Sequence, residues 1–362
     1  RDQGDAQISE SELRDIHLPP YRDAIEAGVG SVMASYSSWN GEKIHGSDYL
    51  LTDVLKEELG FEGLLLSDWA AIDQLPGDYY SDVVTSINAG IDMVMVPYDY
   101  MSFVENLTAA VEAGDVSMDR IDDAVARILT QKFALGLFEN PLTHGEYTAL
   151  VGSAEHRDVA RQCVRESAVL LKNENQTLPI GQDVTRLLVT GRNADDLGAQ
   201  CGGWSISWQG GRGDITEGTS ILEGIREVAP AGTEISYSFN GSGAETADLV
   251  VVVVGEDPYA EGSGDRTDLS LTLFDRMVID TVAASGKPFV VVLVSGRPLI
   301  LGDVLDRCDA LLAAWLPGTE GGGVADILFG YYTPTGKLTH SWPQTMDQIP
   351  INVGDAGYDP LF

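Results

Sequence analysis

The sequence predicts an α/β fold in two domains, each built on a largely parallel sheet. Short apolar runs alternate with segments in which apolar residues recur at helical spacing, the pattern of strands connected through helices. The runs are apolar throughout, as in strands of a parallel sheet that is covered on both faces. The chain has 362 residues, 44% of them hydrophobic, which exceeds what one core normally organises and is enough to fill two.

The first domain is expected to span residues 1–138 and to begin with strand and helix units in series. Its candidate strands are apolar runs, and its candidate helices repeat apolar residues at intervals of three and four. In chain order these strands and helices lie at residues 30–36, 47–60, 61–68, 80–89, 90–97 and 100–114. These units are too few to close a barrel. The sheet is therefore either small and open, or part of a larger sheet whose upstream units are missing.

A long helix, a linker and a second domain follow. Residues 117–142 predict a helix with apolar residues on one stripe (Met118, Ile121, Val125, Ile128 and Leu129). The polar stretch at residues 139–153 reads as a linker to a domain at residues 154–362. That domain has candidate strands at residues 186–191, 249–255, 288–295 and 309–316. The segments between these strands are long enough for helices, which again favours a mainly parallel sheet.

Composition narrows the class of partner. Fifty-six acidic residues against 22 basic ones give a formal net charge of −34, which repels nucleic acid and anionic membrane surfaces. We therefore expect a neutral partner, with no nucleic acid and no membrane. The three cysteines show no C-x-x-C spacing, and no apolar run is long enough to span a bilayer.

One carboxylate stands at the end of a predicted buried strand. In parallel α/β folds, functional groups lie at the carboxyl ends of strands, and Tyr36, Asp68 with Trp69, and Met95 hold such places. An ionised Asp68 at the mouth of an apolar sheet needs hydrogen bonds or a chemical role. Capping the next helix is the alternative, and spacing alone leaves both readings open.

A second group of carboxylates follows the strand at residues 249–255, in a glycine-rich loop. The acidic residues of this loop are Glu256, Asp257, Glu261, Asp265 and Asp268. Their spacing does not match an EF-hand, so we expect no metal and interpret the loop as a mobile carrier of a carboxylic acid. A merely solvated acidic loop is the alternative.

Two tryptophans lie among glycines in residues 201–214. Trp204 and Trp208 are either exposed platforms that stack on flat ligands such as sugar rings, or indoles buried under a long loop. Paired carboxylates with aromatic platforms are what glycoside hydrolysis requires. The sequence has no G-x-S-x-G, P-loop or H-E-x-x-H motif to indicate another chemistry.

Several stretches of the sequence resemble glycoside hydrolase family 3, in its β-glucan exohydrolase and β-glucosidase branch. Together they cover nearly the whole chain. Among them are VMASYSSWNGEKIHG (32–46), GFEGLLLSDWAAID (60–73), CGGWSISWQG (201–210), GEDPYAEGSGDRTDLSL (255–271) and TPTGKLTHSWP (333–343). The resemblance implies that residues 1–138 are the C-terminal β-α units of a (β/α)8-type barrel. It also implies that residues 154–362 form an α/β sandwich domain.

The resemblance also implies site residues. Asp68 is then the catalytic nucleophile and Glu261 the general acid/base, with Glu256 the alternative because it lies in the same loop. Trp69 and Trp208 are expected to clamp the sugar beyond the scissile bond, and Tyr36 to line the pocket. The mechanism is retaining, with the carboxyls roughly 5–5.5 Å apart and no metal or organic cofactor.

The expected function is that of a retaining exo-acting β-glucosidase that releases glucose from non-reducing ends of β-linked glucans or oligosaccharides. A β-xylosidase, an N-acetyl-β-glucosaminidase or an inactive carbohydrate-binding remnant are the alternatives. Family members have further β-α units upstream, so the expected partners include a missing N-terminal barrel segment supplied as a separate chain. The family is commonly exported, which favours a periplasmic or extracellular location.

Overall fold

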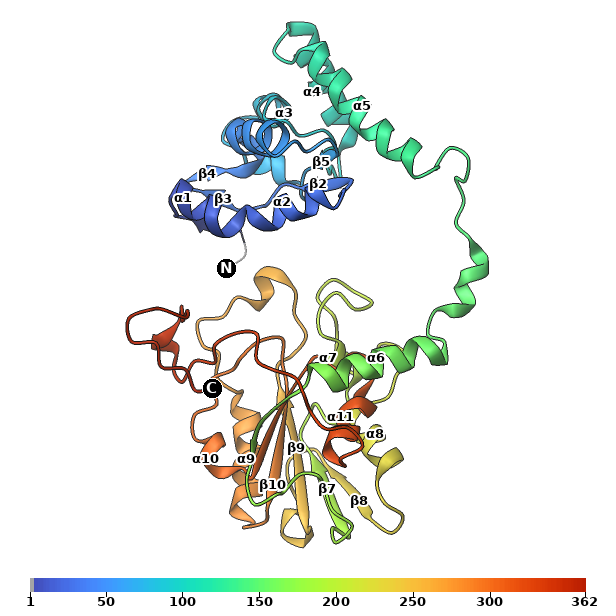
Figure 1. The fold of residues 1–362 in the computed structure, drawn as a ribbon, viewed down its shortest axis with the longest axis vertical. Helices are drawn as coiled ribbons and strands as arrows, with labels where there is room; N and C mark the ends of the chain where they lie inside the picture. Colours follow the sequence, from blue (N-terminus) through green and yellow to red (C-terminus); the bar gives the residue numbers. More distant parts are fainter. Residues whose placement is uncertain (1–2) are drawn as a thin grey trace. The chain divides into compact units, whose positions relative to one another are not determined.

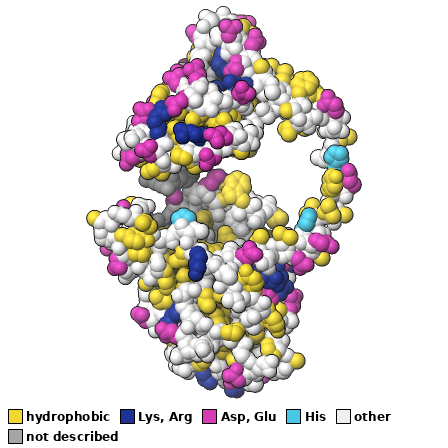
Figure 2. Space-filling view, viewed as in Figure 1, with side chains coloured by type: hydrophobic (Ala, Val, Ile, Leu, Met, Phe, Trp, Pro, Cys, Tyr) yellow, Lys and Arg dark blue, Asp and Glu magenta, His cyan; other side chains and the backbone are white. Residues whose placement is uncertain are grey.

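The computed structural model describes residues 3–362, which form two compact units with the boundary between Gly145 and Glu146 (Figure 1). On the face seen in Figure 2, acidic side chains are spread over both units, as the net charge of −34 leads one to expect. No helix within residues 3–362 combines the length and the apolar character needed to cross a membrane.

The second unit is built on a six-stranded sheet in the order β6-β11-β10-β9-β7-β8. Every neighbouring pair is parallel except β6 with β11, which is antiparallel. The strands are β6 (Val169–Asn173), β7 (Arg186–Thr190), β8 (Glu234–Ser238), β9 (Leu249–Gly255), β10 (Phe289–Val294) and β11 (Ala310–Trp315). The mainly parallel sheet and its four predicted strands are confirmed, whereas β6 and β8 were not predicted.

Helices cover both faces of this sheet (Figure 1). The helices of the unit are α6 (Ala154–Ser167), α7 (Leu197–Cys201), α8 (Ile221–Val228), α9 (Leu273–Ala284), α10 (Val304–Arg307) and α11 (Gly321–Leu328). Successive valines of β9 point to opposite faces, so Val251 packs in the core under α8 and α11 and Val252 in the core under α9. Because both faces are buried, every residue of β9 is apolar, which confirms the α/β sandwich.

The first unit contains a short parallel pair, β2 (Ser31–Met33) with β5 (Leu64–Leu66). A second small sheet joins β1 (Asp5–Ala6), β3 (Ser38–Trp39) and β4 (Glu42–Lys43). The helices are α1 (Glu10–Glu12), α2 (Pro19–Glu26), α3 (Tyr79–Asn88), α4 (Tyr100–Ala113), α5 (Met118–Ala134) and the π-helices Leu13–His17 and Tyr49–Glu58. The strands of residues 3–145 do not close a barrel.

The strand predicted at residues 90–97 is wrong. It makes one isolated bridge, Met93 to Leu66, and no ladder. The reason is the side chain of Asp92, which accepts the Leu65 N–H at 2.8 Å and pairs with Lys56 at 2.8 Å. The carboxylate therefore takes a backbone position that a continuous strand would have filled.

The helix predicted at residues 117–142 is confirmed as α5, but it ends earlier, at Ala134. Its predicted apolar stripe is largely exposed, with Met118, Val125 and Leu129 each more than a third accessible. The helix is held instead by Arg127, whose guanidinium donates to the backbone oxygens of Phe61 at 2.8 Å and of Gly63 at 3.0 Å. Amphipathic spacing identified a face without showing that anything covers it.

Candidate active site

Asp68 follows β5, separated from it by Ser67, and is half-buried. Its Oδ1 accepts the Trp69 N–H at 2.6 Å, and its own N–H donates to Nε2 of His45 at 3.0 Å. Within residues 3–362, its Oδ2 accepts no hydrogen bond. One carboxylate oxygen is therefore available to a ligand.

The capping alternative for Asp68 is wrong. The next helical turn, Ala71–Gln74, is preceded by Ala70 in the left-handed region (φ 51°), and no side chain caps it. Instead, the backbone around Asp68 is fixed from behind by Ser67, whose hydroxyl donates to the Asp68 carbonyl at 2.9 Å and accepts the Met95 N–H at 2.7 Å. The carboxylate therefore binds one backbone N–H, that of Trp69, through Oδ1, and caps no helix.

His45 is a site residue that the sequence reasoning missed. It is 1% exposed, and burial lowers its pKa to about 4 even though the nearby Asp68 carboxylate acts in the opposite direction. The ring is therefore neutral near pH 7, and because Nε2 accepts the Asp68 N–H, its proton lies on Nδ1. The signal that the sequence offered was the position of His45, in the segment between β2 and the helix Tyr49–Glu58.

The buried His45 makes the stability of the first unit depend on pH. Its pKa is lower in the folded chain than the ordinary 6.5, so the unfolded chain binds more protons as the pH falls through this range. The contribution of His45 to the free energy of unfolding is fully present above about pH 6.5. It declines by up to about 3 kcal/mol toward pH 4, at about 1.4 kcal/mol per pKa unit. Urea unfolding of wild type and His45→Gln near these two pH values measures it: the wild type should lose more stability. An equal loss in both would contradict this assignment.

Aromatic side chains surround Asp68. The Trp69 indole is 54% exposed and meets the ring of Tyr98 edge to face, with centroids 6.3 Å apart. Tyr36 donates its hydroxyl to the Trp69 carbonyl at 2.5 Å, and its ring meets His45 at 6.2 Å. The structure thus brings Tyr36 and Trp69 together at Asp68, and adds Tyr98, which the sequence reasoning had not singled out.

In the second unit, Glu256 is buried in an ion-pair network. It is 6% exposed, and its Oε1 accepts two bonds from Arg297, at 3.1 and 2.8 Å, and one from Arg266 at 3.3 Å. The Tyr259 hydroxyl donates to its Oε2 at 3.2 Å. With both oxygens occupied, Glu256 is suited to holding the loop after β9 and not to exchanging a proton with a ligand.

Glu261 differs from Glu256 in its exposure and in its contacts. It is exposed, begins the 3₁₀ turn Glu261–Gly264 and has a left-handed backbone (φ 50°), which is strained for a residue with a side chain. Its carboxylate accepts no hydrogen bond from the part of the chain that the structure describes. Of the two candidate glutamates, only Glu261 is free to reach a ligand.

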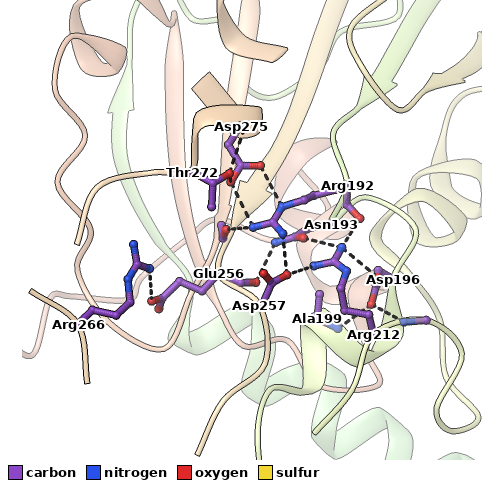
Figure 3. Close-up of polar contacts among 12 residues, drawn as sticks. Arg192, Asn193, Asp196, Ala199, Arg212, Glu256, Asp257, Arg266, Thr272 and Asp275 are labelled. Atoms are coloured by element: carbon purple, nitrogen blue, oxygen red, sulfur yellow. Dashed lines mark hydrogen bonds and ion pairs between the residues drawn. The ribbon is translucent and has the colours of Figure 1, made fainter. Parts of the chain in front are cut away.

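A cluster of charged residues ties the neighbouring loops together (Figure 3). Asp257 accepts bonds from Arg192 at 2.6 Å and from Arg212 at 2.7 Å. Arg192 also donates to the carbonyl of Gly255, at the end of β9, and pairs with the buried Asp275. The loop that holds the tryptophans is therefore fixed to the loop that holds the glutamates.

The two tryptophans of residues 201–214 are exposed, 69% for Trp204 and 55% for Trp208. The Trp204 N–H donates to the Trp208 carbonyl at 2.9 Å, which closes the loop between them. The buried alternative for these indoles is therefore wrong. Within residues 3–362, no group of three or more His, Cys, Asp or Glu side chains is placed to hold a metal ion.

Two family models match the chain. The glycosyl hydrolase family 3 N terminal domain matches residues 2–131, and the glycosyl hydrolase family 3 C-terminal domain matches residues 168–360. The chain belongs to glycosyl hydrolase family 3. The family match covers the segments that carry both Asp68 and Glu261.

Family 3 relatives cover nearly all of this chain. It is 38% identical to a lysosomal beta glucosidase of Dictyostelium discoideum, over 97% of this chain and 46% of that protein. It is 34% identical to a periplasmic beta-glucosidase of Salmonella typhimurium (95% and 50%) and 32% identical to a beta-xylosidase of Formosa agariphila (96% and 52%). The chain thus spans about half the length of these relatives.

Among solved structures of the family, the chain is similar to an exo-1,3/1,4-beta-glucanase from a Pseudoalteromonas species. The identity is 44% and the TM-score 0.94, over all of this chain and 61% of that one. The similarity supports the α/β architecture of both matched segments.

Proposed function

We propose that this chain carries the catalytic carboxyls of a retaining, exo-acting β-glucosidase or β-glucan exohydrolase, which releases glucose from non-reducing ends. The observation that carries the proposal is Asp68, a half-buried carboxylate at the end of β5 with one oxygen free and an exposed indole beside it. Relatives named beta-glucosidase and exo-1,3/1,4-beta-glucanase support the substrate class.

The proposed reaction has two steps. In the first, an oxygen of Asp68 bonds to the anomeric carbon as the bond to the leaving oxygen breaks, and Glu261 gives that oxygen its proton. In the second, Glu261 takes a proton from water, the water oxygen bonds to the anomeric carbon, and the ester to Asp68 breaks. Two inversions leave the sugar in its original β configuration.

The surrounding residues have supporting roles in this proposal. The exposed indoles Trp69 and Trp208 offer flat apolar faces for the sugar beyond the scissile bond, and Tyr36 lines the pocket. The neutral ring of His45 holds the backbone of Asp68 without adding a positive charge.

One observation favours a second candidate, a β-xylosidase. A relative of that name is 32% identical over 96% of this chain. Xylosides differ from glucosides by one exocyclic hydroxymethyl group, a difference that both carboxyls would tolerate. The chemistry at Asp68 and Glu261 is the same in either case, and only the sugar differs.

The location and the partners belong to the same proposal. The relatives include one named periplasmic and one named lysosomal, which favours a periplasmic or extracellular location for this chain. The strands of the first unit fall short of the full set of a (β/α)8 barrel, so we expect turnover to need further β-α units, on this polypeptide or on a separate one.

The test combines an intact mass under denaturing conditions with an activity assay on the same purified sample. We expect glucose release from a β-glucoside to exceed xylose release from the matching β-xyloside, with the β anomer appearing first by NMR. A second polypeptide together with turnover would identify a complemented enzyme. Absence of turnover in a sample that also contains the further β-α units would overturn the proposal.

A further inference from the structure

The loop that carries Trp208 is packed backbone against backbone on the segment that leads to Glu261. A Cβ atom at Gly203 would lie 2.1 Å from the carbonyl oxygen of Tyr259, and one at Gly210 would lie 2.9 Å from Pro258. Such distances leave no room for any side chain at either glycine. The two loops therefore meet at a contact that depends on both glycines.

At this contact, one side chain crosses from the first loop to the second. Gln209, which follows Trp208, accepts the N–H of Ala260 through its Oε1 at 3.1 Å. Ala260 is 4% exposed and directly precedes Glu261. The side-chain amide of Gln209 thus fixes the last backbone N–H before the proposed acid.

The amide nitrogen of the Gln209 side chain stabilises no other part of the chain that the structure describes. This nitrogen, Nε2, is buried and has no hydrogen-bond partner among residues 3–362. A buried donor without a partner is unfavourable, and such a group in a folded protein calls for an explanation beyond stability. Holding Ala260 is the function that the observed hydrogen bond assigns to this side chain.

A second anchor holds the far end of the turn. Arg297 donates to the carbonyl of Gly264 at 2.7 Å and lies over the ring of Tyr259, 4.6 Å from its centroid. Gly264 itself contacts that ring so closely that a Cβ would lie 2.3 Å from it. Glu261 stands between this anchor and Gln209, in a strained backbone conformation that the two anchors maintain.

We propose that Gln209 is a positioning residue for Glu261. Its Oε1 sets the backbone from which the acid projects, and because it adjoins Trp208, it keeps the indole platform and the acid in fixed register. The inference rests on the proposed function, since it requires Glu261 to be the acid. A displacement of ~1 Å at a reacting group can lower a rate on the order of 100-fold, and here the loss is confined to steps that need the proton.

The test replaces Gln209 by leucine, which keeps the bulk and removes the acceptor. For a β-glucoside with a poor leaving group, kcat/KM should fall ~10- to 100-fold, whereas for a dinitrophenyl β-glucoside, whose leaving group needs no proton, it should change by less than about 3-fold. Gln209→Asn, too short to reach Ala260, should show the same split and replaces the leucine variant if that one does not fold. Equal losses on both substrates, or no loss on either, would overturn the inference.

Two controls separate this inference from the proposed function. Gln162→Leu makes the same change on the surface of α6, where Gln162 contacts Glu166, and should leave both substrates unaffected. Azide should restore turnover of the dinitrophenyl glucoside by Glu261→Ala if Glu261 is the acid/base. Rescue by azide together with a silent Gln209→Leu would overturn the inference alone, while absence of rescue would overturn both.

Discussion

Replacing Asp68 by asparagine is expected to lower turnover of every β-glucoside by ~10⁴-fold or more, while the chain keeps its fold. An amide is too weak a nucleophile to form the glycosyl ester, so even activated aryl glucosides lose their first step. Asparagine has the same shape and still accepts the Trp69 N–H, so the turn after β5 is preserved. Steady-state kinetics on dinitrophenyl β-glucoside, with thermal unfolding as the check on folding, measures the effect.

A matched control for this variant is available in the same unit. Asp53 is exposed on the helix Tyr49–Glu58, and Asp53→Asn should leave turnover within about 2-fold of wild type, as is usual for surface changes. In Asp68→Gly, added azide should form the α-glucosyl azide, because it occupies the place of the missing carboxylate. A product of β configuration, or more than ~1% residual turnover in Asp68→Asn, would show that Asp68 is not the nucleophile.

Replacing Glu261 by glutamine is expected to lower kcat/KM for alkyl glucosides or glucan oligosaccharides by ~10²- to 10⁴-fold, the usual contribution of a general acid. The same variant should keep kcat/KM for dinitrophenyl β-glucoside within about 10-fold, since that leaving group departs without protonation. Its kcat on the activated substrate should nevertheless fall, because Glu261 also activates water in the second step. Comparing both constants across leaving groups of graded pKa measures the effect.

Replacing Glu256, the other glutamate of this loop, is the comparison for Glu261→Gln. Glu256→Gln removes the charge that pairs with Arg297 and leaves the guanidinium without its ion-pair partner, which should destabilise the second unit by about 3–5 kcal/mol. Because Arg297 also holds the turn that carries Glu261, any leaving-group dependence in Glu256→Gln should be much weaker than in Glu261→Gln. A leaving-group dependence in Glu256→Gln, with equal losses on both substrates in Glu261→Gln, would reverse the two assignments.

The sequence alone was sufficient for the features that depend on local pattern. The unbroken valine run of β9 predicted a strand buried on both faces, and the run that ends at Asp68 placed this carboxylate at a strand end. Both predictions were possible because a strand that is buried on both faces has apolar residues at successive positions. The family resemblance rests on similar short stretches and is confirmed by the matches over both segments.

Features that depend on partners distant in the sequence were decided only by the tertiary structure. His45 lies 23 residues before Asp68, and Arg297 lies 41 residues after Glu256, so neither pairing has a local signal. The strand expected around Asp92 fails for the same reason, because its carboxylate binds Leu65 and Lys56 from other elements.

The difference between Glu256 and Glu261 shows the division most clearly. In the sequence they are two glutamates of one acidic loop, and the composition of that loop does not distinguish one from the other. The fold buries the first against Arg297 and exposes the second on a strained turn. Residue types and strand ends were determined by the sequence, whereas which carboxylate is paired and which is free was decided by contacts that only the folded chain assembles, because hydrogen bonds and ion pairs join groups by proximity in space.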